Sequence, residues 1–278
     1  MVFTKHQFQK VDIYKRSTKA SLPAKRSYPH VASDSLGTKL YVFGGYDLDA
    51  SSEVNSMAIY DILTDSWEVT VTQLSSNFFH LGASVVVADT IYFIGGVSSE
   101  EAYNSFYRGI FTVGASINGT VASYNMEYNT WNYSIPSMPT PRFQTVTFTI
   151  NNRIYVGGGR DSQFDSSVMD IYDISTNSWL APTELPGLPL SQASSAVSSN
   201  LGFIMGGFSG VLQQENSLVR STWTFNTRIS AWRTDIFTSL STPRANHKSV
   251  ALDGYIYVLG GQSNSTTLST VERILPCF

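Results

Sequence analysis

The stretch Tyr41-Val42-Phe43-Gly44-Gly45 is an apolar run that ends in two glycines, and variants of it recur along the chain. The other four runs are Tyr92-Phe-Ile-Gly-Gly96, Tyr155-Val-Gly-Gly-Gly159, Phe203-Ile-Met-Gly-Gly207 and Tyr257-Val-Leu-Gly-Gly261. The second glycines of successive runs are 51, 63, 48 and 54 residues apart. A recurrence at this period indicates an array of similar structural units.

A second spacing recurs between the glycine pairs. Each of the first four pairs is followed by an aromatic residue seven positions before a tryptophan, in Tyr60/Trp67, Tyr124/Trp131, Tyr172/Trp179 and Phe225/Trp232. The residues between each aromatic and its tryptophan are rich in Asp, Asn, Thr and Ser, which is typical of a hairpin turn. The apolar run before each glycine pair has the β-branched and aromatic composition of a buried strand. Each repeat therefore predicts four short antiparallel strands.

A single four-stranded sheet with two apolar faces must bury both of them against neighbours, and radial packing of such sheets gives a β-propeller. The doubled glycine, the Tyr-x6-Trp pair and the Pro-Arg pairs at 141–142 and 243–244 resemble the kelch repeat. The resemblance covers nearly the whole chain and implies an all-β, five-bladed kelch-type propeller of four-stranded blades.

The repeats divide the chain into one domain, residues 1–278, with blades at about 22–73, 74–137, 138–185, 186–240 and 241–278. The last repeat ends before a tryptophan could occur, whereas the segment around Val11–Tyr14 lies about as far before Arg26 as Trp232 lies before Arg244. We therefore expect residues 8–16 to complete the last blade and close the ring. Because kelch propellers usually have six or seven blades, the alternative is that five repeats are part of a longer chain.

Composition narrows the class of protein. Charged residues make up 14% of the chain and hydrophobic residues 42%, so the chain can bury enough apolar surface to fold. The net charge of −3 argues against an electrostatic nucleic-acid binder, and no apolar run is long enough to predict a membrane span. The single cysteine, Cys277, fits a reducing compartment, so we expect a cytoplasmic protein. We also expect a monomer.

The kelch resemblance implies a protein-interaction module that binds at the loops around the central channel. The positions that it assigns to this face are the starts of the innermost strands and the residues after the glycine pairs: Arg26, Ser27, Tyr46, Arg142, Arg160, Phe208, Arg244 and Gln262. Arginine forks suit carboxylates, so a protein or peptide partner with an acidic segment, or a small ligand at the channel mouth, is expected. The alternative is that each arginine binds carboxylates or loop carbonyls of the propeller itself.

Three histidines suggest a different function. His30, His80 and His247 come three or four residues after Arg26, Asn77 and Arg244, at similar heights on predicted innermost strands. If the imidazoles converge in the channel, they could hold a transition metal ion or a substrate. A small-molecule enzyme, such as a lyase, isomerase or oxidoreductase, is therefore the alternative to a binding module, for which no cofactor is predicted.

One repeat carries a long insertion. Between Gly96 and Tyr124 there are 28 positions, against 13 to 18 in the other repeats, and the 97–120 segment includes several aromatic residues. Long ordered loops on a rigid scaffold commonly carry function, so the segment could fold over the channel mouth. An extra β-ribbon on its own blade is the other interpretation.

Overall fold

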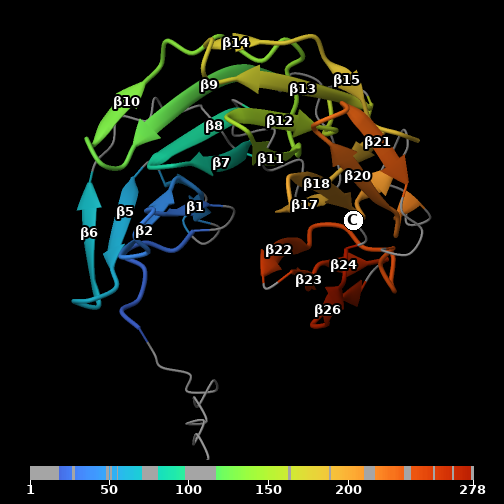
Figure 1. The fold of residues 1–278 in the computed structure, drawn as a ribbon. Coiled ribbons are helices and arrows are strands. Elements are labelled where there is room, and N and C mark those ends of the chain that lie inside the picture. The colour runs from blue at the N-terminus through green and yellow to red at the C-terminus, as the bar shows by residue number, and fades with distance from the viewer. Residues whose placement is uncertain are drawn as a thin grey trace, which may run out of the picture.

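The computed structural model describes residues 19–26, 29–47, 50, 52–54, 56–70, 81–97, 117–161, 164–187, 189–209, 217–234, 239–252, 254–264 and 266–276. These residues form antiparallel β-sheets that follow one another around a common axis, which is the predicted five-bladed propeller (Figure 1). Among the described residues, no helix is long and apolar enough to cross a membrane.

The first two blades have the predicted four strands. In blade 1 the order is β1 (His30–Ser33), β2 (Lys39–Phe43), β5 (Met57–Asp61) and β6 (Ser66–Thr70). Blade 2 contains β7 (Ala83–Val87), β8 (Thr90–Val97), β9 (Ile117–Asn125) and β10 (Thr130–Asn132). A short hairpin of β3 (Tyr46–Asp47) and β4 (Ser52–Glu53) follows the first glycine pair.

The next two blades repeat this order. Blade 3 contains β11 (Val146–Ile150), β12 (Arg153–Gly157), β13 (Val168–Asp173) and β14 (Ser178–Trp179), and β15 (Thr183–Glu184) also pairs with β13. Blade 4 contains β17 (Ser194–Ser198), β18 (Leu201–Met205), β20 (Thr222–Asn226) and β21 (Ala231–Thr234). Beside it, β16 (Leu190–Ser191) pairs with β19 (Phe208–Ser209).

Blade 5 has three strands among the described residues: β22 (Lys248–Leu252), β23 (Tyr255–Leu259) and β26 (Val271–Ile274). A hairpin of β24 (Gln262–Ser263) and β25 (Thr266–Thr267) follows its glycine pair. The predicted fourth strand, residues 8–16, lies outside the described residues, so closure of the ring by this segment stays a prediction.

The recurring aromatic–tryptophan pairs face each other across the predicted hairpins. Tyr172 is the direct partner of Trp179 between β13 and β14, and their ring centroids are 5.3 Å apart. The Tyr172 hydroxyl donates to Asn177 Oδ1 at 2.6 Å, and Asn177 has a left-handed φ of 49°. Asparagine accepts this conformation at lower cost than most residues, so the turn, the hydrogen bond and the ring contact support one another.

The main apolar cores lie between blades. Phe43 of blade 1 and Phe93 of blade 2 meet with ring centroids 4.9 Å apart, within a buried cluster that includes Met57 and Tyr124. Similar clusters join blades 2 and 3, blades 3 and 4, and blades 4 and 5. Because blades 2, 3 and 4 have such a cluster on both faces, their second strands read as continuous apolar runs rather than alternating ones.

Main-chain hydrogen bonds also link the blades close to the axis. The amide of Gln144 donates to Leu81 O at 2.8 Å, the amide of Gln192 to Gln144 O at 3.3 Å, and the amide of Asn246 to Gln192 O at 3.0 Å. All four of these residues have φ between 54° and 56°, so blades 2 to 5 each have a left-handed residue at the same position shortly before the innermost strand. These bonds set the spacing of blades 2 to 5 around the axis.

The second glycines of blades 2, 3 and 4 make another recurring link. Gly207 donates to Arg244 O of the next blade at 2.7 Å, as Gly96 does to Arg142 O at 3.1 Å and Gly159 to Leu190 O at 2.7 Å. Gly207 has φ of 103°, and a Cβ added there would lie 2.6 Å from Ser191 O. The doubled glycine is therefore required by close approach of the backbones as well as by conformation.

Blade 5 presents an exposed apolar face. Val250, Leu252, Leu259 and Val271 are 52%, 57%, 42% and 61% exposed, although their neighbours on the other face pack against blade 4. In Figure 1 this blade lies across an opening from blade 1. On blade 1, Val31 of the innermost strand is 56% exposed. The described residues thus leave apolar side chains uncovered on both terminal blades.

Candidate functional site

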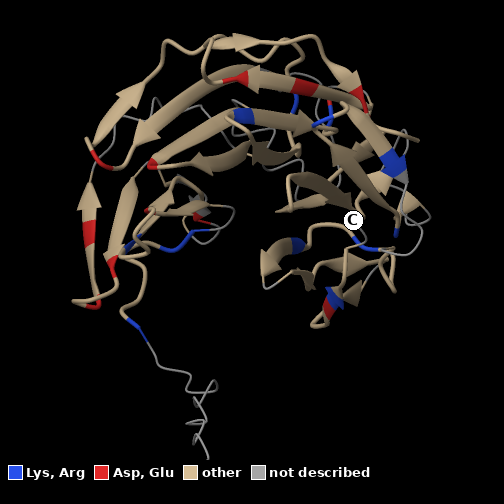
Figure 2. Ribbon diagram, in the orientation of Figure 1, with Lys and Arg blue, Asp and Glu red and all other residues tan. Residues whose placement is uncertain are grey.

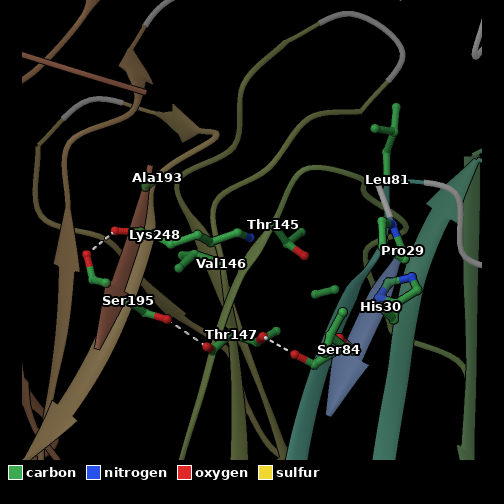
Figure 3. Close-up of a pocket in the computed structure, with 15 residues that line it drawn as sticks. Pro29, His30, Leu81, Ser84, Thr145, Val146, Thr147, Ala193, Ser195 and Lys248 are labelled. Atoms are coloured by element: carbon green, nitrogen blue, oxygen red, sulfur yellow. Dashed lines mark hydrogen bonds between the residues drawn. The ribbon is translucent and has the colours of Figure 1, made fainter. Parts of the chain in front are cut away.

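The innermost strands of all five blades surround a cavity of about 600 Å³. Its lining comes from the beginnings of β1, β7, β11, β17 and β22 and from the residues just before them. Figure 3 shows His30 on one side and Lys248, from the opposite side, extending across the cavity toward Thr145. This is the inner end of the channel mouth that the sequence assigned to ligand binding.

The arginines at the predicted binding positions are held within their own blades. Arg142 Nε donates to Gly158 O at 2.7 Å, and Arg142 Nη1 lies 3.0 Å from Asp170 Oδ2 on the third strand. Arg244 donates to Gly260 O at 2.9 Å and pairs with Glu272, also on a third strand. Arg26 Nη1 donates to Gly44 O at 3.1 Å. The recurring arginine thus binds the first glycine of the pair in its own blade.

Burial removes two of these arginines from the surface. Arg142 is 0% exposed and Arg244 is 1% exposed, and both guanidinium groups are surrounded by the carbonyls and carboxylates named above. Burial lowers the pKa of Arg142 and raises that of Asp170, while their attraction opposes both shifts. Arg142 and Arg244 are therefore covered and bind carboxylates and carbonyls of the propeller itself, which was the alternative interpretation of the arginines. Neither guanidinium group is exposed for contact with a partner.

The remaining predicted binding residues have varied positions. Arg160 is 5% exposed, with Nε 3.3 Å from Asp165 Oδ1, and Phe208 is 6% exposed in β19. Gln262 is half-buried at the start of β24, and the backbone of Tyr46 pairs with Glu53 in the first hairpin. Ser27 lies outside the described residues. Among the predicted binding residues whose burial the structure describes, Gln262 and Arg26 are therefore the two that are partly exposed.

An exposed aromatic residue on the same face did not belong to the predicted set. Phe164 follows the third glycine pair and is 49% exposed. Its amide donates to Asp161 Oδ1 at 2.7 Å and its carbonyl accepts from the Asp161 amide at 3.1 Å. The buried Arg160–Asp165 ion pair closes the base of this turn. An apolar residue flanked by two aspartates after a glycine pair was the signal that could have indicated a fixed turn.

His30 and His247 do not converge as their spacing suggested. His30 lines the cavity and meets Phe93 edge to face, with ring centroids 5.3 Å apart. His247 is 2% exposed and lies against Gly206 of blade 4, outside the cavity lining. His30 follows its arginine by four residues and His247 by three, and one residue reverses the side of a strand. His80 lies outside the described residues, among which no group of three His, Cys, Asp or Glu could hold a metal ion.

Hydroxyl groups line the channel and join the innermost strands. Ser195 Oγ donates to Thr147 O at 2.7 Å, and Thr147 Oγ1 donates to Ser84 O at 3.4 Å (Figure 3). The hydroxyls of Ser194 and Ser249 bond to each other. A hydroxyl that donates its proton keeps lone pairs that can accept another hydrogen bond. The channel wall is thus polar and offers acceptors.

The base of the long insertion extends its own blade. Gly96 pairs with Asn118 and Val97 with Ile117, which lengthens the β8–β9 hairpin beyond the glycine pair. Val97 is 1% exposed and packs with Phe143 of blade 3. Residues 98–116 lie outside the described residues, so the role predicted for the 97–120 insertion at the channel mouth is untested.

Family models match two parts of the chain. The KLHDC2/KLHL20/DRC7 Kelch-repeats domain matches residues 114–261, which is more than half of the 278 residues, and the Kelch motif matches residues 28–71. The chain belongs to the kelch-repeat family. The kelch resemblance inferred from the glycine pairs and the Tyr-x6-Trp spacing is thereby confirmed, and with it the propeller fold.

Curated relatives are also kelch proteins. The chain is 28% identical over 193 residues to the Kelch-like protein terF of Aspergillus terreus, which covers 68% of this chain and 40% of the relative. It is 24% identical over 268 residues to the Kelch repeat and BTB domain-containing protein 1 of cowpox virus, covering 95% of this chain and 44% of the relative. Human Kelch-like protein 23 is 24% identical over 179 residues, 52% of this chain and 31% of the relative. This kelch chain spans less than half the length of these relatives.

Proposed function

We propose that this kelch propeller binds a protein partner through the face formed by the loops after the glycine pairs. Membership of the kelch family, with Kelch-like relatives, supports a protein-interaction module in general. The observation that carries the proposal for this face is Phe164, an aromatic side chain half exposed on a turn that is closed by a buried ion pair. Because main-chain bonds hold the backbone of this residue, it loses little backbone conformational entropy when a partner covers it.

The partner chemistry differs from that expected from the arginines. An acidic segment was inferred from Arg142 and Arg244, and both bind groups of the propeller itself. Phe164 and the half-buried amide of Gln262 instead suit a segment that inserts an apolar side chain and supplies a main-chain hydrogen bond. Such a partner would be recognised mainly by shape and apolar contact.

The experiment is affinity capture from cell extract with the whole chain, followed by titration of the purified partner. Phe164→Ala should weaken binding about tenfold or more without changing the melting temperature, because truncation of a central aromatic contact commonly costs at least about 1.4 kcal/mol. Tyr128→Ala is the matched control, since Tyr128 is 68% exposed in the outer β9–β10 hairpin turn. The proposal would be contradicted if the partner bound Phe164→Ala as tightly as the unaltered chain and bound Tyr128→Ala more weakly. That result would place the interface at the outer hairpins.

A further inference from the structure

The cavity at the axis carries a positive charge without a carboxylate beside it. Fifteen residues line the cavity, and Lys248 is the basic one while none is Asp or Glu. Lys248 is exposed, is the first residue of β22, and makes no salt bridge with any carboxylate that the structure describes. Figure 2 shows most Asp and Glu residues on outer strands and turns, away from the axis. The electrostatic field inside the cavity therefore favours an anion.

The wall around Lys248 suits a ligand that carries hydroxyl groups. The Thr147 and Ser195 hydroxyls already donate to main-chain carbonyls, so toward the cavity they act as acceptors. The Lys248 ammonium supplies donors, and it reaches across the lumen rather than folding back onto its own strand (Figure 3). A ligand that combines one anionic group with several hydroxyl groups matches both parts of the lining.

The dimensions agree with a small molecule. The cavity of about 600 Å³ falls within the roughly 300–1,000 Å³ of small-molecule sites. The parts of the wall that come from blades 2 to 5 are held in place by the main-chain and hydroxyl bonds between their innermost strands, so little ordering of these parts is required on binding. From the charge, the acceptors and the size, we infer that the channel binds a small polyhydroxylated anion, of the sugar phosphate or sugar acid class, anchored by Lys248. This inference does not depend on the proposed partner binding.

The test uses isothermal titration of the whole chain with glucose 6-phosphate, inorganic phosphate and glucose. Saturable binding of glucose 6-phosphate, weaker binding of phosphate and none of glucose is the expected order. Lys248→Met should weaken the sugar phosphate at least about tenfold, because it removes the charged donor. Lys39→Met is the matched control, since Lys39 is an exposed lysine of β2 outside the cavity lining.

A second measurement does not depend on any Lys248 variant being folded. The imidazole of His30 lines the same cavity, so its NMR signals in the unaltered chain should shift during the titration, with the assignment made from His30→Gln. Absence of saturable binding, or equal affinity in Lys248→Met and Lys39→Met, would overturn the inference. Phosphate binding as tightly as glucose 6-phosphate would overturn the polyhydroxylated part and leave a simple anion site.

Discussion

His247 shows how one side chain at a blade interface can set the response of the protein to pH. Burial, together with the nearby charges of Arg244 and Lys248, lowers its pKa to about 4 in the folded protein. In the unfolded chain a histidine has a pKa near 6.5. The unfolded state therefore binds a proton between these values while the folded state does not. The stability that depends on neutral His247 is complete above about pH 6.5 and is lost as the pH falls toward 4.

The free energy of unfolding of the whole chain should accordingly fall between pH 7.5 and pH 5, with about 2 kcal/mol of the change due to His247. Urea unfolding at the two pH values measures this. In His247→Gln, which cannot take up a proton, the pH dependence should be smaller by that amount, whereas His30→Gln at the cavity lining serves as the control. An identical pH dependence in His247→Gln and the unaltered chain would show that folding does not lower the pKa of His247.

At the scale of the blade, the buried arginine connects strands that are distant in sequence. Arg142 precedes the innermost strand of blade 3, yet it binds Gly158 at the end of the second strand and Asp170 on the third. Arg153 makes an ion pair in the same sheet with Asp173, but its side chain is 44% exposed. Blade 3 therefore contains one buried and one exposed ion pair, whose contributions to stability can be compared in the same sheet.

Arg142→Met should destabilise the chain by about 3–5 kcal/mol, because it leaves the carboxylate of Asp170 buried without its partner. Arg153→Met should cost less than about 1 kcal/mol, as is usual for exposed pairs. Denaturant unfolding of both variants gives the comparison. The double variant Arg142→Met with Asp170→Leu should recover much of the loss. Similar losses in the two single variants would mean that burial is not what makes the Arg142 pair important.

The elements that the sequence predicted best are those written in local patterns. Gly206-Gly207 marks a strand end and Tyr172/Trp179 marks a hairpin. Each pattern involves residues that are close in sequence, so the spacing alone predicted the local structure. The role of Arg142 did not, because its acid lies on another strand. Asp170 and Glu272 each lie 28 residues after the arginine they bind, and this shared spacing is a signal that could have identified the pairs. The position of Lys248 in the cavity lining was not predicted. Successive side chains of a strand point to opposite sides, so a one-residue uncertainty in register leaves the side that faces the cavity undefined.

At the scale of the whole molecule, the N-terminal segment is predicted to complete blade 5. Within the described part of the chain this blade has three strands, with β26 at the outer edge, and its exposed face carries Val250, Leu252 and Val271. Residues 8–16, which lie outside the described part of the chain, are predicted to add the fourth strand. Pairing at this edge would cover backbone groups that otherwise invite association with other chains.

Deletion of residues 1–20 should therefore lower the melting temperature by about 8 °C or more. This shift corresponds to a loss of about 2–4 kcal/mol in the free energy of unfolding of a domain of this size. Deletion of residues 1–7 is the control, because it leaves the predicted strand intact. Thermal unfolding monitored by circular dichroism measures both. If the two truncated chains melt at the same temperature as the full chain, residues 8–16 take no part in the closure of the ring.

The recurring bonds between blades have a consequence for evolution. Blades 2 to 5 each present the same left-handed residue at the axis, and the second glycines of blades 2 to 4 each donate to the following blade. A duplicated repeat inserted between two of these blades would meet a matching donor and acceptor on either side. Blade number can thus change through gain or loss of a whole coding unit, with no new interface chemistry to be selected.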